Sequence, residues 1–229
     1  MEQKMIQGTL LRRYKRFLAD VQLESGEVIV AYCCNTGKLL GVPENALIML
    51  TDHGADTKRK LRFTWEWFKD GETWVGINTH EANKIVEELL ASKQIPGLEH
   101  YTSIRKEVKY GINSRIDFLL ENEEKRLYLE VKSIHMKRNG HAQFPDCPTK
   151  RGAKHMLELS NIIDQNTKAA VLYLVQRDDC ETFSIAADLD PVYEKAAEAA
   201  HKSGVSVYAA GLKMCIKEGK RFSHMLKVR

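Results

Sequence analysis

The stretch SRIDFLLENEEKRLYLEVKS, residues 114–133, decides the fold because it predicts two strands joined by a polar turn. Side chains alternate between the two faces of a strand. Asp117 therefore lies on one face of the first strand, and Glu130 and Lys132 share one face of the second. A four-residue loop at 122–125 pairs Glu121 with Arg126, and the same register places Asp117 directly opposite Glu130. Like charges in that position destabilise a sheet, and a bound divalent cation would offset their repulsion.

Magnesium suits such a pair because it binds through few carboxylates and keeps several waters. Lys132 would lie beside the cation, where an ammonium group can orient an attacking water and stabilise negative charge on a phosphate. The pattern therefore predicts metal-assisted phosphodiester hydrolysis, with Asp117 and Glu130 as metal ligands and Lys132 as a catalytic residue. Spacing alone leaves an alternative open, in which the three residues have no catalytic role and form an ordinary solvated face with a charge pair.

The rest of the chain divides at about residue 78. Strand-like runs at 9–23, 27–34, 46–52, 60–68 and 73–78, separated by turn signals, predict a small all-β module, either a barrel or a sandwich. Interleaved basic and aromatic residues favour an oligonucleotide-binding (OB) barrel. From residue 79 the pattern changes to helix, three strands, helix, strand, helix, strand, which predicts a mixed α/β sheet flanked by helices. We therefore expect an OB-like domain at 1–78 and a second domain at 79–229.

Composition is ordinary for a globular protein, with 43% hydrophobic and 29% charged residues. No apolar run approaches the roughly 18 residues of a membrane-spanning helix, and the amino terminus lacks an apolar stretch of signal-peptide length. We expect a cytoplasmic protein that makes no membrane contact. The five cysteines fit neither a disulfide framework nor a zinc site, so free thiols are expected.

Basic residues that could hold phosphates gather in the segments RRYKR at 12–16 and KRKLR at 58–62 and at the start of the helix that follows FPDCPTKRG, and Lys38 lies beside the turn CNTG. The candidate nucleic-acid contacts there are Arg12, Arg13, Lys15, Arg16, Lys38, Lys150, Arg151 and Lys154. A solvated basic strand edge is the alternative for the first segment. At the helix start, Asp146 or Thr149 could simply cap the helix and leave its basic residues exposed.

The residues around the acidic pair resemble the PD-(D/E)XK nuclease superfamily. Its usual core has this same order of helices and strands, with an acidic residue on the second strand and an E-x-K motif on the third. The resemblance implies that Asp117, Glu130 and Lys132 form the catalytic centre. It also makes Glu107, on the preceding strand, a candidate third acidic metal ligand.

A closer resemblance covers nearly the whole chain. The stretches RYKRFLADV (13–21), CNTGKLLG (34–41), VGINTHEAN (75–83), SRIDFLL (114–120), EVKS (130–133), FPDCPTKRGAKHMLEL (144–159) and GVSVYAA (204–210) are similar to the sugar fermentation stimulation protein (SfsA) family. This resemblance implies a bacterial or archaeal cytoplasmic protein with an OB-like domain followed by a nuclease-like domain. It also implies DNA binding and a link to the regulation of sugar utilisation.

The expected function is DNA binding combined with a magnesium- or manganese-dependent nuclease centre, with DNA held without strong sequence specificity. Two alternatives from other classes remain at this point. One is a non-catalytic DNA-binding regulator of sugar metabolism genes. The other is a protein-interaction module with an incidental acidic pair, which would bind no nucleic acid.

Overall fold

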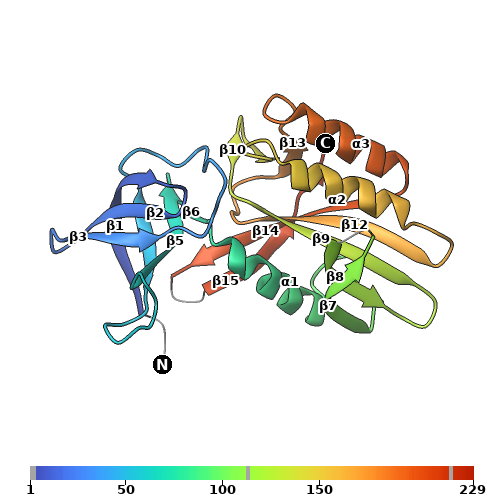
Figure 1. Cartoon of the computed structure of the whole chain (residues 1–229), viewed down its shortest axis with the longest axis horizontal. Helices are drawn as coiled ribbons and strands as arrows, with labels where there is room; N and C mark the ends of the chain where they lie inside the picture. Colours follow the sequence, from blue (N-terminus) through green and yellow to red (C-terminus); the bar gives the residue numbers. More distant parts are fainter. Residues whose placement is uncertain (1–3, 112–113, 217–218) are drawn as a thin grey trace.

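A computed structural model describes residues 4–111, 114–216 and 219–229 of the chain. Its amino-terminal part is a single closed sheet (Figure 1). The strands are β1 (Lys4–Tyr14), β2 (Leu18–Leu23), β3 (Val28–Tyr32), β4 (Leu47–Asp52), β5 (Phe63–Asp70) and β6 (Thr73–Gly76). They pair in the order β3-β2-β1-β4-β5-β6, and a further parallel pairing of β3 with β5 closes the sheet. This closure makes the module a barrel and excludes the sandwich.

The first strand-like run differs from its expected form, because residues 9–23 fold back on themselves as the hairpin β1–β2. The turn between them contains Lys15 and Arg16, which both adopt positive φ angles of 49° and 66°. Hairpin turns with this backbone usually carry glycine or asparagine. Two basic residues give no such signal, so the sequence did not reveal the turn.

The carboxy-terminal part contains the expected order of elements. It comprises the 3-10 turn η1 (Thr79–Glu81), helices α1 (Ala82–Ala91), α2 (Lys150–Asn161) and α3 (Pro191–Lys202), and strands β7 (Ser103–Tyr110), β8 (Ser114–Glu121), β9 (Arg126–Ile134), β12 (Thr167–Val175) and β14 (Ser206–Cys215). Five further strands were not predicted: β10 (Lys137–Arg138), β11 (His141–Phe144), β13 (Thr182–Ile185), β15 (Gly219–Met225) and β16 (Lys227–Val228). They are short or polar, so they lack the apolar runs by which strands are recognised.

The larger sheet, ordered β15-β14-β12-β9-β8-β7, has helices on both faces. Helix α1 covers one face with its apolar positions Ala82, Ile85, Val86, Leu89 and Leu90, all buried as its periodicity predicted. Helices α2 and α3 pack together on the other face (Figure 1). A second sheet, β10-β11-β13-β16, lies beside them.

Buried polar contacts join the barrel to the larger sheet. Arg177, only 1% exposed, donates hydrogen bonds to Asp70 of β5 at 2.7 Å and to Asp179 at 2.6 Å. In addition, the Gly76 N–H donates to the carbonyl of Gln176 at 2.9 Å. The bonds from Arg177 to Asp70 and from Gly76 to Gln176 therefore join the two parts.

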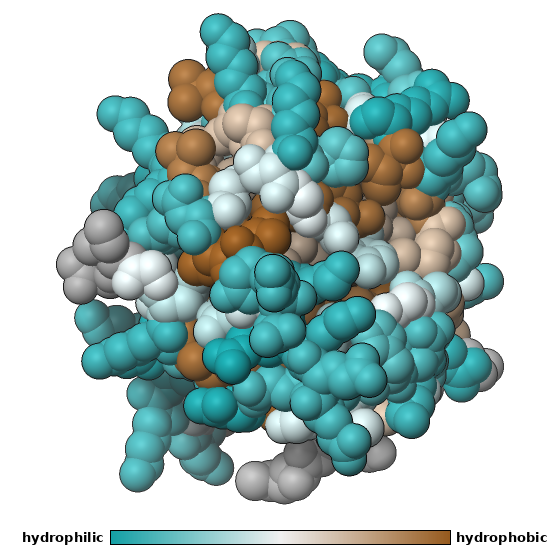
Figure 2. Space-filling model, turned by 90° about the vertical axis from the view of Figure 1, so that its right-hand side faces the viewer, coloured by the Kyte–Doolittle hydropathy of each residue, from teal (hydrophilic) through white to brown (hydrophobic). Residues whose placement is uncertain are grey.

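Hydrophilic side chains cover much of the end opposite the barrel, with smaller apolar patches between them (Figure 2). Within the described ranges, no helix is long and apolar enough to cross a membrane.

Candidate active site

The hairpin β8–β9 carries the acidic pair, and its register near the turn matches the prediction. Glu121 pairs with Arg126, and the antiparallel ladder continues to Phe118 opposite Leu129. It stops there, so Asp117 and Glu130 are not the direct cross-strand pair that the register predicted. Beyond the last pair, the side-chain carboxylate of Asp117 accepts the backbone N–H of Val131 on β9.

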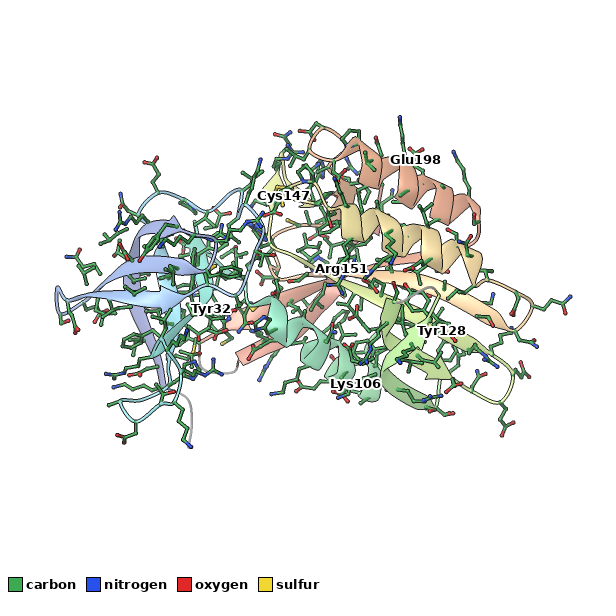
Figure 3. The ribbon with its side chains drawn as sticks, in the orientation of Figure 1. Tyr32, Lys106, Tyr128, Cys147, Arg151 and Glu198 are labelled. Atoms are coloured by element: carbon green, nitrogen blue, oxygen red, sulfur yellow. The ribbon has the colours of Figure 1, made fainter. Side chains whose placement is uncertain are left out.

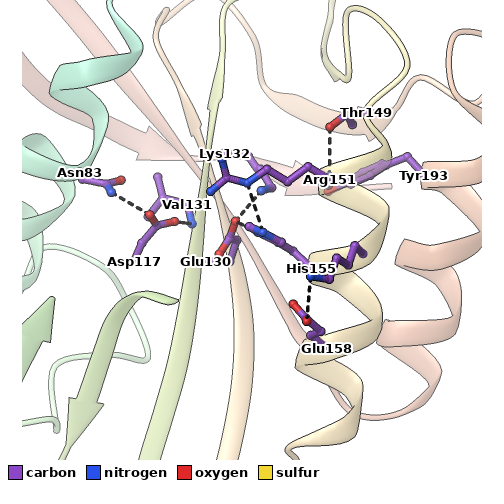
Figure 4. Close-up of polar contacts among 12 residues, drawn as sticks. Asn83, Asp117, Glu130, Val131, Lys132, Thr149, Arg151, His155, Glu158 and Tyr193 are labelled. Atoms are coloured by element: carbon purple, nitrogen blue, oxygen red, sulfur yellow. Dashed lines mark hydrogen bonds and ion pairs between the residues drawn. The ribbon is translucent and has the colours of Figure 1, made fainter. Parts of the chain in front are cut away.

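Asp117 is held from two directions. One carboxylate oxygen, Oδ2, accepts the N–H of Val131 at 2.7 Å, and the other, Oδ1, accepts the side-chain amide of Asn83 at 2.8 Å. Asn83 belongs to α1, so the helix and both strands of the hairpin fix the position of this carboxylate (Figure 4). No sequence pattern had singled out Asn83, because its contact joins residues 34 positions apart.

Glu130 lies deeper and is 3% exposed. Its Oε1 atom accepts a hydrogen bond from Lys132 Nζ at 2.6 Å and contacts Nδ1 of His155 on α2 (Figure 4). The other oxygen, Oε2, is buried and has no hydrogen-bond partner among the described residues. A buried carboxylate oxygen without a partner is costly, and a cation would satisfy it.

The pKa values of the two carboxyl groups move apart. Burial raises the pKa of Asp117 above its ordinary value, and the negative charge of Glu130 raises it further. Burial also opposes ionisation of Glu130, but the hydrogen bond from His155 and the charge of Lys132 outweigh it and lower the Glu130 pKa. Glu130 thus keeps its charge, and Asp117 is the group that takes up a proton more readily.

The fit of this site to a divalent cation rests on Asp117 and on the unpartnered Oε2 of Glu130. In the described part of the chain, no three His, Cys, Asp or Glu side chains are grouped so that they could hold a metal ion. Two carboxylates, completed by a backbone carbonyl and water, match the ligand set that magnesium accepts.

Glu107, the candidate third ligand, is not part of such a group. Lys106 pairs with Phe118 and Val108 with Ile116, so Glu107 stands opposite Asp117 in the β7–β8 register. It has a positive φ of 53° and an exposed side chain. Because it lines a cavity together with both carboxylates, it lies near the acidic pair without joining it.

Two cavities open beside the acidic pair. The first, of about 470 Å³, extends from Asp117, Glu130 and Lys132 to Arg16 and residues 35–37 of the barrel. The second, of about 430 Å³, is lined by Glu107, Ser114, Arg115 and Lys154 in addition to the acidic pair. Arg151 and His155 line both. Arg115 is thus a site residue that the sequence analysis did not select, although it lies only two positions before Asp117.

The basic residues expected to contact nucleic acid are only partly brought together. Arg16 and Arg151 line the first cavity, and Lys154 lines the second. Arg13 instead donates to the backbone carbonyls of Arg16 at 2.8 Å and Asn35 at 2.7 Å, which gives it a structural role.

The remaining predicted contacts lie outside the cavities. Arg12 forms an ion pair with Asp20 at 2.7 Å, and Lys15, Lys38 and Lys150 are exposed.

The loop before α2 settles the choice of helix cap. Thr149 is the N-cap, and its hydroxyl accepts the N–H of Gly152 at 3.1 Å. Asp146 instead reaches the barrel, where its Oδ2 atom accepts the N–H of Leu39 at 2.8 Å. This contact holds the loop around Gly37 against the first cavity.

Comparisons with known proteins agree with this architecture. The family model described as the SfsA N-terminal OB domain matches residues 11–77, and that of the sugar fermentation stimulation protein RE domain matches residues 80–218. The sugar fermentation stimulation protein homolog of Rhodospirillum rubrum is 42% identical, over 90% of this chain and 89% of that protein. The homolog of Agrobacterium fabrum is 47% identical, over 90% of this chain and 87% of that protein.

Among solved structures, that of Pyrococcus furiosus SfsA in complex with Ca²⁺ superposes with a TM-score of 0.89 at 25% identity. The match covers 99% of this chain and 96% of that one. Both parts of the molecule therefore have counterparts in one solved structure and in two family models. The chain belongs to the sugar fermentation stimulation protein (SfsA) family, with an OB domain followed by a restriction-endonuclease-like domain.

Proposed function

We propose that this protein binds DNA and hydrolyses its phosphodiester bonds with the help of a magnesium or manganese ion. In this proposal, residues 1–78 form a domain that helps to hold the DNA backbone, and residues 79–229 form the domain with the catalytic centre. The observation that carries the proposal is the pair of the partly buried Asp117 and the buried Glu130, with one unpartnered carboxylate oxygen and Lys132 beside it. The Ca²⁺ bound by the Pyrococcus furiosus relative supports a divalent cation here as well.

Asp117 and Glu130 would hold the cation, which when bound supplies Lewis-acid activation of water and neutralises charge on the phosphate. The protein's own part is to keep both carboxylates in place. Val131 and Asn83 fix Asp117, while His155 and Lys132 fix Glu130.

Lys132 would also take part in the reaction itself. Its ammonium group has three donors, of which one is used by Glu130. The side chain is 14% exposed and lines the first cavity, so its other donors can orient the attacking water and stabilise charge on a phosphate oxygen. Arg16 and Arg151, on the same cavity, supply positive charge for neighbouring phosphates.

The reaction adds one water across a P–O bond. The water oxygen bonds to phosphorus, the bond from phosphorus to the leaving oxygen breaks, and that oxygen takes up a proton. The products are a phosphate monoester and a hydroxyl, with no change in oxidation state.

The test uses labelled single-stranded, duplex and supercoiled DNA, each with magnesium, manganese or EDTA. We expect cleavage that depends on the metal and is lost in Asp117→Asn and Lys132→Ala. Glu121→Gln is the matched control, because Glu121 lies on the same strand as Asp117 and only forms a surface ion pair with Arg105. Metal-dependent binding without cleavage of any substrate would overturn the catalytic proposal and favour the non-catalytic regulator.

A further inference from the structure

From the way the two cavities meet, we infer that a single nucleic-acid strand passes through both of them, so that the protein cuts within a strand and needs no chain end. This inference rests on the proposed function and adds to it the form of the substrate and the mode of cleavage. It also assigns a phosphate-binding role to Arg115 in the second cavity.

The position of the acidic pair is the first observation. Asp117 and Glu130 line both cavities, so the two cavities adjoin at the acidic pair. The cavities follow one another along α2. Thr149, at the start of the helix, lines only the first, Lys154 lines only the second, and Arg151 and His155 line both. A strand that enters beside the barrel can therefore continue past the carboxylates.

The second observation is charge in the cavity farther from the barrel. Arg115 lines this cavity and stands directly opposite Lys109 in the β7–β8 ladder. Like charges at directly opposed positions destabilise a sheet. Across the described residues, neither of the two forms an ion pair with a carboxylate.

Other cations of β7 are compensated. Arg105 pairs with Glu121 at 3.4 Å, and Lys106 pairs with Glu87 of α1 at 2.8 Å. Among the described cations of β7 and β8, those without an ion pair are thus Lys109 and Arg115, which stand opposite each other beside the second cavity. An anionic backbone would relieve the repulsion there. Lys154, 55% exposed on α2 and paired with Glu158 at 3.4 Å, lines the same cavity.

Size determines which form of nucleic acid can enter. Volumes of about 470 and 430 Å³ are those of sites for single small molecules, and each suits a nucleotide unit of one strand better than a duplex. Glu130 is 3% exposed, so the reacting phosphate must enter the cleft to approach it. The chemistry is the hydrolysis described above, applied to a phosphodiester with nucleotides on both sides.

The first test compares covalently closed circular single-stranded DNA with its linear form, both with magnesium or manganese. We expect the circle to be cut, first to full-length linear strand and then to shorter pieces, and to stay intact with Asp117→Asn. Shortening of the linear strand from its ends while the circle stays intact would overturn this inference and leave the nuclease proposal standing. Cleavage of duplex DNA but of neither single-stranded form would also overturn this inference, whereas cleavage of no DNA substrate at all would overturn the proposed function.

The second test measures binding of a single-stranded oligonucleotide in the Asp117→Asn background, at several salt concentrations. Arg115→Ala should weaken binding several-fold, and the slope of log affinity against log salt should become shallower by about 0.7, the value for one lost phosphate contact on a single strand. The matched control is Lys106→Ala, which removes an equal charge that pairs with Glu87 and lines neither cavity. Lys106 lies beside α1, apart from Arg151 (Figure 3). An unchanged slope in Arg115→Ala, or equal losses in both variants, would overturn the phosphate contact.

Discussion

His155 and Glu130 meet in the interior of the protein, although 25 residues separate them along the chain. Nδ1 of the imidazole contacts Oε1 of the carboxylate, while Nε2 accepts a hydrogen bond from Arg151 Nε at 3.4 Å. These partners require that the neutral ring carry its proton on Nδ1 and donate it to Glu130. His155 thus occupies one oxygen of Glu130 and leaves the other for a cation.

Replacing His155 should therefore weaken metal binding without removing a ligand. In His155→Ala we expect affinity for Mg²⁺ or Mn²⁺, measured by isothermal titration calorimetry, to fall about 10- to 100-fold, as is typical when the partner of a ligand is lost. His155→Asn, which retains an N–H donor, should recover part of the loss. His201→Ala, on the exposed side of α3, is the control. Unchanged affinity in His155→Ala would show that the ring only fills space beside Glu130 and does not influence the metal ligand.

Arg16 provides a test of the contact between the barrel and DNA. Its side chain lines the first cavity, whereas that of Arg12, four residues earlier, is paired with Asp20. Arg16→Ala should weaken single-strand binding several-fold at low salt and less at high salt, because phosphate contacts release counterions. Arg12→Ala should have a smaller effect when both variants are compared by filter binding. Equal losses in the two variants would argue for a diffuse basic surface.

Arg177 should be important for stability, since its guanidinium group is buried between two carboxylates from different parts of the chain. Arg177→Ala leaves Asp70 and Asp179 without their shared partner, and we expect the free energy of unfolding to fall by about 3–5 kcal/mol. The exposed pair of Arg138 and Asp188 offers the comparison: Arg138→Ala should cost about 1 kcal/mol or less. Urea denaturation of both variants measures the difference, and similar costs would contradict the bridging role.

Asp52 should contribute to the loss of stability in acid. A hydrogen bond from Arg62 is the main reason that the pKa of Asp52 is lowered to about 2. A carboxyl group whose pKa is depressed on folding stabilises the protein above its unfolded pKa of about 3.9, and that contribution disappears as pH falls through the folded value. Because Arg62 is 46% exposed, screening limits the contribution to about 0.2–1 kcal/mol.

The corresponding variant is Asp52→Asn. It should be less stable than the parent protein at about pH 7, and the two should converge as the pH approaches about 2. Urea unfolding at both pH values tests this. A difference that stays constant with pH would assign the effect to packing.

Much of this fold could be predicted from local patterns in the sequence. The period of apolar residues located α1 and its buried face, and alternation placed Asp117, Glu130 and Lys132 together on one hairpin. These features depend on neighbours within a few residues, where helix and strand geometry alone determines which side chains share a face. Strand-like runs with interleaved basic and aromatic residues favoured the OB barrel, and the order of helices and strands followed from periodicity. The resemblance to a known family supported both, and both family models agree with it.

Only the tertiary structure decided how the acidic pair is held. The ladder stops before Asp117, whose carboxylate is bound by Asn83 and Val131, and Glu130 loses access to water because His155 reaches it from α2. Arg16 lines the cavity because a turn without a glycine signal brings it there. Each of these outcomes depends on contacts between residues far apart in the chain. Such contacts form only when the whole molecule packs, and they produce no periodic pattern in the sequence.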